Sequence, residues 1–242
     1  MYMTSNAYMK TLHVQHTTTG TLTNETFSIK DVFALAGHTN SAGNVTWLQT
    51  HAPSDTTASV VTALLNEGAV LNGMTHTDEL MYSLNGENIH YGMPKNPYDD
   101  ERICGGSSSG AASSVANGEA TFALGTDTGG SVRIPAAYCG LYGIRPTYNA
   151  VSLDGVIPLA KSFDTVGWIA HDAKMLAAVG DVLLPKQHVH PFTTLLVEHQ
   201  SFQMLSQKHR RCMIDVLTAL KLPSASITLA VGGLHISPHA RH

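Results

Sequence analysis

The chain has 242 residues, of which 43% are hydrophobic and 13% are charged, and its formal net charge is −4. This length and apolar content can form one large domain with a core, and they exclude a disordered chain. The weak acidic balance provides no basic surface for nucleic acid or an anionic membrane, so we expect neither partner.

The cysteines and the N-terminus indicate the compartment. Cys104, Cys139 and Cys212 are odd in number and widely spaced, which predicts reduced thiols and not a disulfide framework. The first ten residues lack a basic start followed by an apolar run, so no secretory signal is expected. No apolar run approaches the length of a membrane span. We therefore predict a cytoplasmic protein, with no metal and no cofactor.

The first predicted strand carries a lysine at its end. Residues 1–26 are polar and rich in threonine, and they predict an irregular or hairpin entry. Residues 27–33 then alternate apolar and polar side chains, which is typical of a strand. Lys30 would end this strand, with Asp31 turned to the opposite face. Considered alone, Lys30 is interpreted most simply as a surface lysine.

A helix and a second strand follow. Residues 54–56 (Ser-Asp-Thr) can cap a helix, and the apolar residues between 60 and 65 predict one buried face. Gly68 would end this helix, and residues 69–71 form a short apolar run typical of a buried strand. Helix followed by strand is the alternation of an α/β sheet.

Two adjacent acidic residues and a cysteine precede the centre of the chain. Asp78 and Glu79 could be an acid–base pair, but neighbouring residues do not share a helix face, so a turn or helix start is the preferred prediction. Cys104 could be a nucleophile. A small buried side chain is the better interpretation, because no histidine follows at a spacing typical of cysteine proteases.

Residues 105–135 are dominated by glycine, serine, alanine and threonine, and a glycine pair directly precedes both Ser107 and Ser131. Such a pair lets several amide N–H groups point the same way, so a hydroxyl and an oxyanion-binding site can coincide. A flexible linker is the alternative, but the apolar run at 120–124 argues against it. The small residues at 107–118 predict a buried helix, and residues 121–124 predict a strand.

The order of these motifs resembles one enzyme family. GGSSSG followed by GTDTGGSVRIPAAYCGLYGIRPT is similar to the signature of the amidase signature family, and Ser107 and Ser131 stand at the family's spacing of 24 positions. The resemblance extends from about residue 27 to about residue 184. Met74, where many members have a lysine, and the run S-x-N-G-E-N-x-H-Y-G resemble the branch that includes plant-type indole-3-acetamide hydrolases.

The resemblance implies an α/β fold with a mixed central sheet covered by helices on both faces. It also implies a Ser-Ser-Lys triad: Ser131 as nucleophile, Ser107 as relay after a cis peptide bond from Gly106, and Lys30 as base. The segment around Lys30 is similar to the family's lysine segment. A lysine amine titrates near about 10.4 in water, so Lys30 must be desolvated to act near neutrality. The implied oxyanion hole is formed by the amides of Thr128, Gly129, Gly130 and Ser131.

Several charged residues near and after the second serine are predicted to have structural roles. Arg133 should pair with a carboxylate, and Asp127 is one candidate. Asp164 should shape a loop, with a catalytic aspartate as the alternative. Asp172 should cap a helix that ends before Pro185.

The resemblance fades after about residue 186, and residues 186–242 are interpreted as a divergent tail. Residues 202–220 permit one or two helices. His188 and His190 could suggest a metal site, but two ligands without a third are weak, so a solvated tail is preferred. Family members usually continue further, which suggests a shortened or altered C-terminal part. We predict a single domain over residues 1–242.

The resemblance implies an amidase that hydrolyses the C–N bond of small or aryl-alkyl carboxamides to carboxylate and ammonia through a serine acyl-enzyme. Its partner would be a small linear amide, and a homodimer is left open. The first alternative is the A-type subunit of an amidotransferase, which supplies ammonia to a partner and usually has the lysine that Met74 replaces. The second alternative is a truncated, non-catalytic relative.

Overall fold

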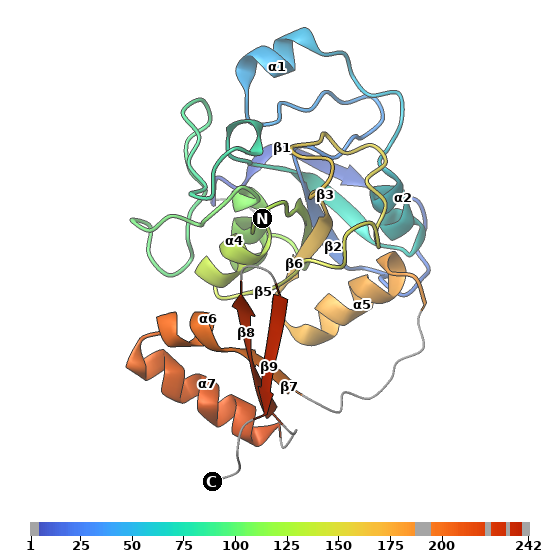
Figure 1. Cartoon of the computed structure of the whole chain (residues 1–242). Coiled ribbons are helices and arrows are strands. Elements are labelled where there is room, and N and C mark those ends of the chain that lie inside the picture. Colours follow the sequence, from blue (N-terminus) through green and yellow to red (C-terminus); the bar gives the residue numbers. More distant parts are fainter. Residues whose placement is uncertain (1–4, 187–194, 221–223, 231–232, 239–242) are drawn as a thin grey trace. The chain divides into compact units, whose positions relative to one another are not determined.

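A six-stranded sheet with the strand order β1-β3-β2-β4-β6-β5 lies at the centre of the first part of the chain in the computed structural model (Figure 1). Strand β2 pairs parallel with both β3 and β4, and the remaining pairs are antiparallel. The strands are β1 (Tyr8–Val14), β2 (Thr26–Lys30), β3 (Val70–Thr75), β4 (Phe122–Thr126), β5 (Tyr142–Ile144) and β6 (Val166–Ala170). The predicted mixed α/β sheet is therefore confirmed.

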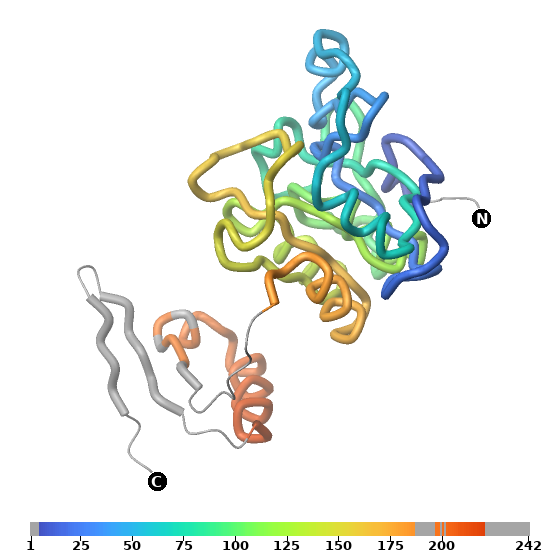
Figure 2. Tube along the Cα trace, turned by 90° about the vertical axis from the view of Figure 1, so that its right-hand side faces the viewer, coloured from blue at the N-terminus to red at the C-terminus, as the bar shows by residue number. Residues whose placement is uncertain are grey.

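Helices cover both faces of this sheet, as predicted. Alternate residues of β4 enter two separate cores: Phe122 and Leu124 pack with α2 and α5, and Ala123 packs with α3 and α4. Helices α2 and α5 are far apart in the sequence but lie side by side (Figures 1 and 2). The helices are α1 (Val45–Thr50), α2 (Ser59–Asn66), the 3-10 turn η1 (Glu79–Met81), α3 (Ser109–Ala116), α4 (Arg133–Tyr138) and α5 (Ala173–Leu183).

The structure describes residues 5–186, 195–220, 224–230 and 233–238. The chain divides into two compact units between Lys186 and Gln187. The boundary falls where the family resemblance fades. Whether the two units form one domain stays a prediction.

In its described residues, the second unit contains a three-stranded sheet in the order β7-β8-β9 and two helices. The elements are β7 (Leu195–Glu198), α6 (His199–Met204), α7 (Gln207–Ala219), β8 (Ser224–Ala230) and β9 (Gly233–Pro238). The sequence permitted one or two helices between residues 202 and 220, and the structure has two, α6 and α7, of which α6 begins earlier, at His199. His188 and His190 lie outside the described residues.

Three local differences separate the structure from the sequence-based expectations. The entry segment contains the edge strand β1, which pairs with β3, and helix α1 was not anticipated. Helix α2 begins at Ser59 after Ala58, which provides no side-chain cap, so the predicted cap at residues 54–56 is wrong. The hydroxyl of Ser54 donates to the carbonyl of Thr56 at 2.8 Å, a local turn that competes with capping.

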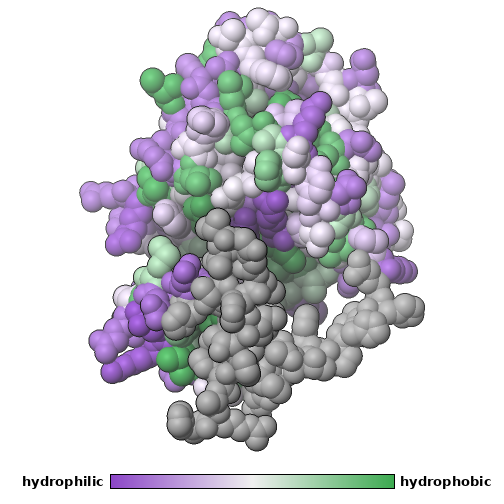
Figure 3. Space-filling model, in the orientation of Figure 1, coloured by the Kyte–Doolittle hydropathy of each residue, from purple (hydrophilic) through white to green (hydrophobic). Residues whose placement is uncertain are grey.

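Exposed apolar side chains are scattered over the first unit. Figure 3 shows hydrophobic residues interspersed with hydrophilic ones over the face that it presents. Single exposed apolar residues of this kind are ordinary on folded proteins. Within the described part of the chain, no helix is both long enough and apolar enough to cross a bilayer.

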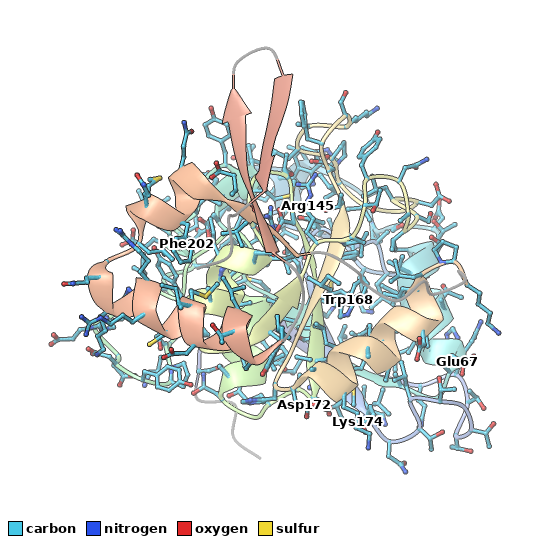
Figure 4. All side chains as sticks on the ribbon, turned by 60° about the horizontal axis from the view of Figure 1, so that its bottom comes forward. Glu67, Arg145, Trp168, Asp172, Lys174 and Phe202 are labelled. Atoms are coloured by element: carbon cyan, nitrogen blue, oxygen red, sulfur yellow. The ribbon has the colours of Figure 1, made fainter. Side chains whose placement is uncertain are left out.

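The N-cap of α5 provides a test of the fold. The Asp172 carboxylate accepts from the Met175 N–H at 2.8 Å, and the Trp168 indole donates to the Leu176 carbonyl at 2.8 Å (Figure 4). Asp172→Ala should lower the free energy of unfolding by about 1 kcal/mol, because the N–H groups of the first turn lose their acceptor. Urea denaturation checks this. The control is Asp181→Ala, an exposed position in the same helix, which should change stability little; equal losses would contradict the cap.

Candidate active site

The carboxyl ends of two parallel strands bring the lysine to the centre of the candidate site. Lys30 is the last residue of β2 and Thr126 is the last residue of β4, the parallel neighbour of β2. Both side chains are buried, and Lys30 Nζ lies 2.9 Å from Thr126 Oγ1. The packed sheet therefore holds the amine in one position, away from water.

Ser107 reaches the same amine from the loop that precedes α3. Its Oγ lies 2.7 Å from Lys30 Nζ, and both residues are 0% exposed. The peptide bond between Gly106 and Ser107 is cis, as the resemblance implied. The sequence-based prediction that Lys30 and Ser107 meet is thus matched by a hydrogen-bond distance.

The environment of Lys30 favours the uncharged amine. Burial lowers its pKa from 10.5 to about 7, against the opposing effect of the carboxylates of Asp78, Asp127 and Asp164. The adjacent Asp31 is turned elsewhere, as predicted, because its carboxylate accepts from Asn40 Nδ2 at 3.2 Å and from the Ser41 N–H at 2.9 Å. A substantial fraction of Lys30 is therefore neutral near pH 7, as a general base must be.

Ser131 lies beside the loop that carries Ser107, in the turn between β4 and α4. Its carbonyl accepts from the Ser108 N–H at 3.1 Å, so the two serine-bearing loops are joined through their backbones. Ser131 is 4% exposed, whereas Ser107 is 0% exposed. Of the two residues, Ser131 is thus the one with some access to solvent.

Asp127 organises the turn that carries Ser131. Its carboxylate accepts from the N–H groups of Gly130 at 2.8 Å and Val132 at 3.1 Å, and it pairs with Arg133 at 3.0 Å. Although burial raises the pKa of Asp127, the bonds from Arg133 and Val132 lower it to about 2. The predicted pairing of Arg133 with Asp127 is confirmed. Arg145, which sequence reasoning did not assign, approaches the same carboxylate at 3.4 Å.

The four amides expected to form an oxyanion hole are not equally available. The Gly130 N–H is already bound to Asp127. Within residues 5–186, the N–H groups of Gly129 and Ser131 have no protein acceptor. Gly129 is exposed, and a Cβ built there would meet nothing within 4 Å, so there is open space before this stretch of backbone. Together with Thr128, these amides remain predicted oxyanion donors.

Two further residues fill the structural roles that were preferred for them. Asp164 accepts from the Thr128 hydroxyl at 2.6 Å and from the N–H groups of Leu159 and Ala160 at 3.0 Å, which fixes a loop. Cys104 is fully buried, and its thiol donates to the Pro94 carbonyl at 3.2 Å. All three cysteines are free thiols, as predicted.

Two polar groups near the amine were missed by sequence reasoning. Thr126 was not assigned a role, although its place at the end of the strand before the second glycine pair could have indicated one. Asp78 was interpreted as a turn residue, yet it is fully buried. Among the described residues, no group of three His, Cys, Asp or Glu side chains could hold a metal ion.

The sequence of this chain is similar to the sequences of known proteins. The sequence model of a family described as Amidase matches residues 3–230. The chain is 50% identical over 186 residues to Amidase 1 of Arabidopsis thaliana, covering 76% of this chain and 44% of that protein. It is 44% identical over 164 residues to the A-type subunit of glutamyl-tRNA(Gln) amidotransferase from Methanosarcina mazei, covering 68% of this chain and 34% of that protein.

A third relative and two solved structures complete the comparison. Outer envelope protein 64, chloroplastic, of Arabidopsis thaliana is 41% identical over 213 residues, covering 87% of this chain and 33% of that protein. A crystal structure of an amidase is 31% identical with a TM-score of 0.73, covering 88% of this chain and 50% of that chain. The A-type subunit of the Thermotoga maritima glutamyl-tRNA(Gln) amidotransferase shares the fold, with a TM-score of 0.80 at 24% identity and coverage of 94% and 55%. The chain spans less than half the length of these three curated relatives.

Proposed function

Because this chain belongs to the amidase signature family, we propose that it hydrolyses the C–N bond of small or aryl-alkyl carboxamides to carboxylate and ammonia. The observation that carries the proposal is the 2.7 Å distance between Lys30 Nζ and Ser107 Oγ, in a site where burial favours the neutral amine. The similarity to Amidase 1 of Arabidopsis thaliana supports an amidase.

The proposed reaction forms and then hydrolyses an acyl-enzyme. Ser131 Oγ attacks the amide carbonyl carbon, and its proton passes through the Ser107 hydroxyl to Lys30. The tetrahedral intermediate collapses with cleavage of the C–N bond, and the proton returns from Lys30 through Ser107 to the leaving nitrogen. Water then attacks the Ser131 ester by the same route and releases the carboxylate.

The backbone around Ser131 would stabilise the negative oxygen of the intermediate. We assign this role to the amides of Thr128, Gly129 and Ser131, with Gly130 shared between Asp127 and the oxyanion. Support comes from the open space before Gly129 and from the Asp127 and Arg133 contacts that fix the turn. Fixed donors stabilise developing charge without reorganisation during the reaction.

The pKa of Lys30 predicts the pH dependence of the reaction. Since burial lowers this pKa from 10.5 to about 7, the neutral amine becomes the main form as pH rises through about 7. The rate of covalent labelling by a fluorophosphonate, which reacts with activated serines, should therefore rise with pH through about 7 and then level off. The measurement is the second-order labelling rate from about pH 5.5 to about pH 9. A rate that first rises near pH 10 would show an unperturbed lysine and contradict the assignment.

The class of substrate requires a separate test. A panel of carboxamides, including aryl-alkyl amides and glutamine, should be assayed for ammonia release by this chain and by any longer native form. We expect release from small or aryl-alkyl amides. No release from any of them, together with no fluorophosphonate labelling, would reject the amidase proposal and favour a non-catalytic relative.

A second candidate function rests on the relative from Methanosarcina mazei, which is named as part of an amidotransferase. In this alternative the same triad would release ammonia from glutamine for a partner protein. Met74, which is 1% exposed, replaces the lysine usual in such proteins, and this favours the free amidase. Glutaminase activity that appears only with a partner would reverse the preference.

The cellular location and the oligomeric state remain predictions. A cytoplasmic protein was expected from the sequence, whereas one relative is named as a chloroplast outer envelope protein. Fractionation of cells that produce this chain would decide between these locations. Whether the chain forms a homodimer, which the sequence left open, can be tested by light scattering.

A further inference from the structure

A buried carboxylate that the proposed reaction does not use lies against the relay serine. Asp78 is 0% exposed and directly precedes η1. Its N–H donates to the Ser107 carbonyl at 3.3 Å. A Cβ built on Gly106 would lie 2.5 Å from either carboxylate oxygen of Asp78. Asp78 therefore contacts the two residues on either side of the cis peptide bond, Ser107 through its backbone and Gly106 through its carboxylate, and a side chain at residue 106 would displace that carboxylate.

The charge of Asp78 is poorly compensated by its surroundings. Its Oδ2 accepts from the Gly86 N–H at 3.1 Å, but its buried Oδ1 has no hydrogen-bond partner among the described residues. By contrast, Asp127 has Arg133 and Arg145, and Asp164 has a hydroxyl and two N–H donors. A buried carboxylate with so few partners is costly unless a positive charge forms nearby.

The backbone after Asp78 has an unusual conformation, and it brings Met81 against a hydrogen-bond partner of Lys30. Leu80 and Met81 both adopt positive φ, at 48° and 63°, although neither is glycine. Such residues are uncommon and cluster at functional sites. Met81 Sδ accepts from Thr126 Oγ1 at 3.7 Å, and that oxygen lies 2.9 Å from Lys30 Nζ. The short segment 78–81 thus contacts both hydrogen-bond partners of Lys30.

We propose that Asp78 is a positioning residue for the reaction proposed above: it holds Gly106 and Ser107 in place, and its negative charge favours the protonated Lys30 that forms when Ser131 attacks. This inference rests on the proposed amidase function. The other charged groups that act on Lys30 are Asp127, after β4, and Asp164, before β6. Since both are compensated by their own partners, Asp78 supplies the least screened charge near the amine.

The test is Asp78→Asn, which keeps the shape and removes the charge. With less stabilisation of the ammonium, the pKa of Lys30 should fall, so the acidic limb of fluorophosphonate labelling should move to lower pH by about one pH unit. The matched control is Glu79→Gln at the neighbouring residue, whose exposed carboxylate is bound by Asn44 and His90. In this control, the acidic limb of the labelling rate should lie at the same pH as in the wild type.

The outcomes separate this inference from the proposed function. If Asp78→Asn is folded and labelled, and its labelling rate rises over the same pH range as that of the wild type, the proposed role of Asp78 is wrong. The proposed triad would not be affected by this result. A wild-type chain without labelling would instead reject the amidase proposal. Circular dichroism checks folding, and Asp78→Ser provides the same charge removal with a smaller side chain. If Asp78 had a purely structural role, the substitution would lower the fraction of protein that is labelled, but the acidic limb of the labelling rate would stay at the same pH. That result would also contradict the inference.

Discussion

Replacing Ser131 with alanine should abolish covalent labelling by a fluorophosphonate and reduce amide turnover by a factor on the order of 10⁶. The physical reason is that the acyl-enzyme needs an oxygen nucleophile at this position. Ser107 cannot replace it, because its Oγ is fully buried against Lys30. Labelling is followed by intact-protein mass, and turnover by ammonia release.

The matched control for this loss is Ser109→Ala. Ser109 is also a buried serine of the glycine–serine segment, but it opens helix α3 and contacts neither Lys30 nor Ser131 through a hydrogen bond of its side chain. We expect this variant to be labelled at a rate close to wild type. Equal labelling of Ser131→Ala and wild type would mean that another residue carries the acyl group.

Replacing Lys30 with methionine should slow labelling by about 10²–10⁴-fold, the usual contribution of a general base, without unfolding the chain. Methionine has a similar length and no charge, so it should fill the same buried position beside Ser107 and Thr126. The measurement is the labelling rate near pH 8, on protein shown to be folded by circular dichroism. Labelling at the wild-type rate would remove Lys30 from the mechanism.

The same variant should change the pH dependence of stability. The pKa of Lys30 is about 7 in the folded chain and 10.5 in the unfolded chain, so folding releases a proton between these values. Wild-type stability should therefore rise with pH between about 7 and 10.5, relative to the methionine variant, and the difference should be constant below about pH 7. Urea denaturation of both proteins at several pH values checks the sign. A difference that did not vary with pH would indicate a hydrated lysine.

Much of the fold could be predicted because local patterns and tertiary packing agree. The alternation at residues 27–33 became β2, and the small residues before Gly118 became α3, packed closely on the sheet. Edge strand β1 was not predicted, because its sequence has no clear alternation of buried and exposed residues and the strand depends on pairing with β3. Helix α1 was not predicted either, because it has only six residues and none of them is buried.

The residues of the candidate site that stand in sequence motifs could be predicted, and the others could not. Ser107 and Ser131 could be named because glycine pairs and their spacing identify them, whereas Lys30 could be named only because its segment resembles the family's lysine segment; the roles of all three rest on that resemblance. The role proposed for Asp78 could not be predicted, because it rests on the contact of its carboxylate with Gly106 and on an Oδ1 that has no hydrogen-bond partner among the residues that the structure describes. These properties arise only when the segment after β3 packs on the loop before α3. The engagement of the Gly130 amide by Asp127 is likewise visible only in three dimensions.

The most direct test of the account is to identify the residue that a fluorophosphonate modifies in the wild-type chain. The protein is labelled near pH 8 and digested, and fragment-ion mass spectrometry locates the adduct among the serines between Arg102 and Arg133. The account predicts an adduct on Ser131. An adduct on Ser107 or another serine, or no adduct on a folded chain, would contradict it.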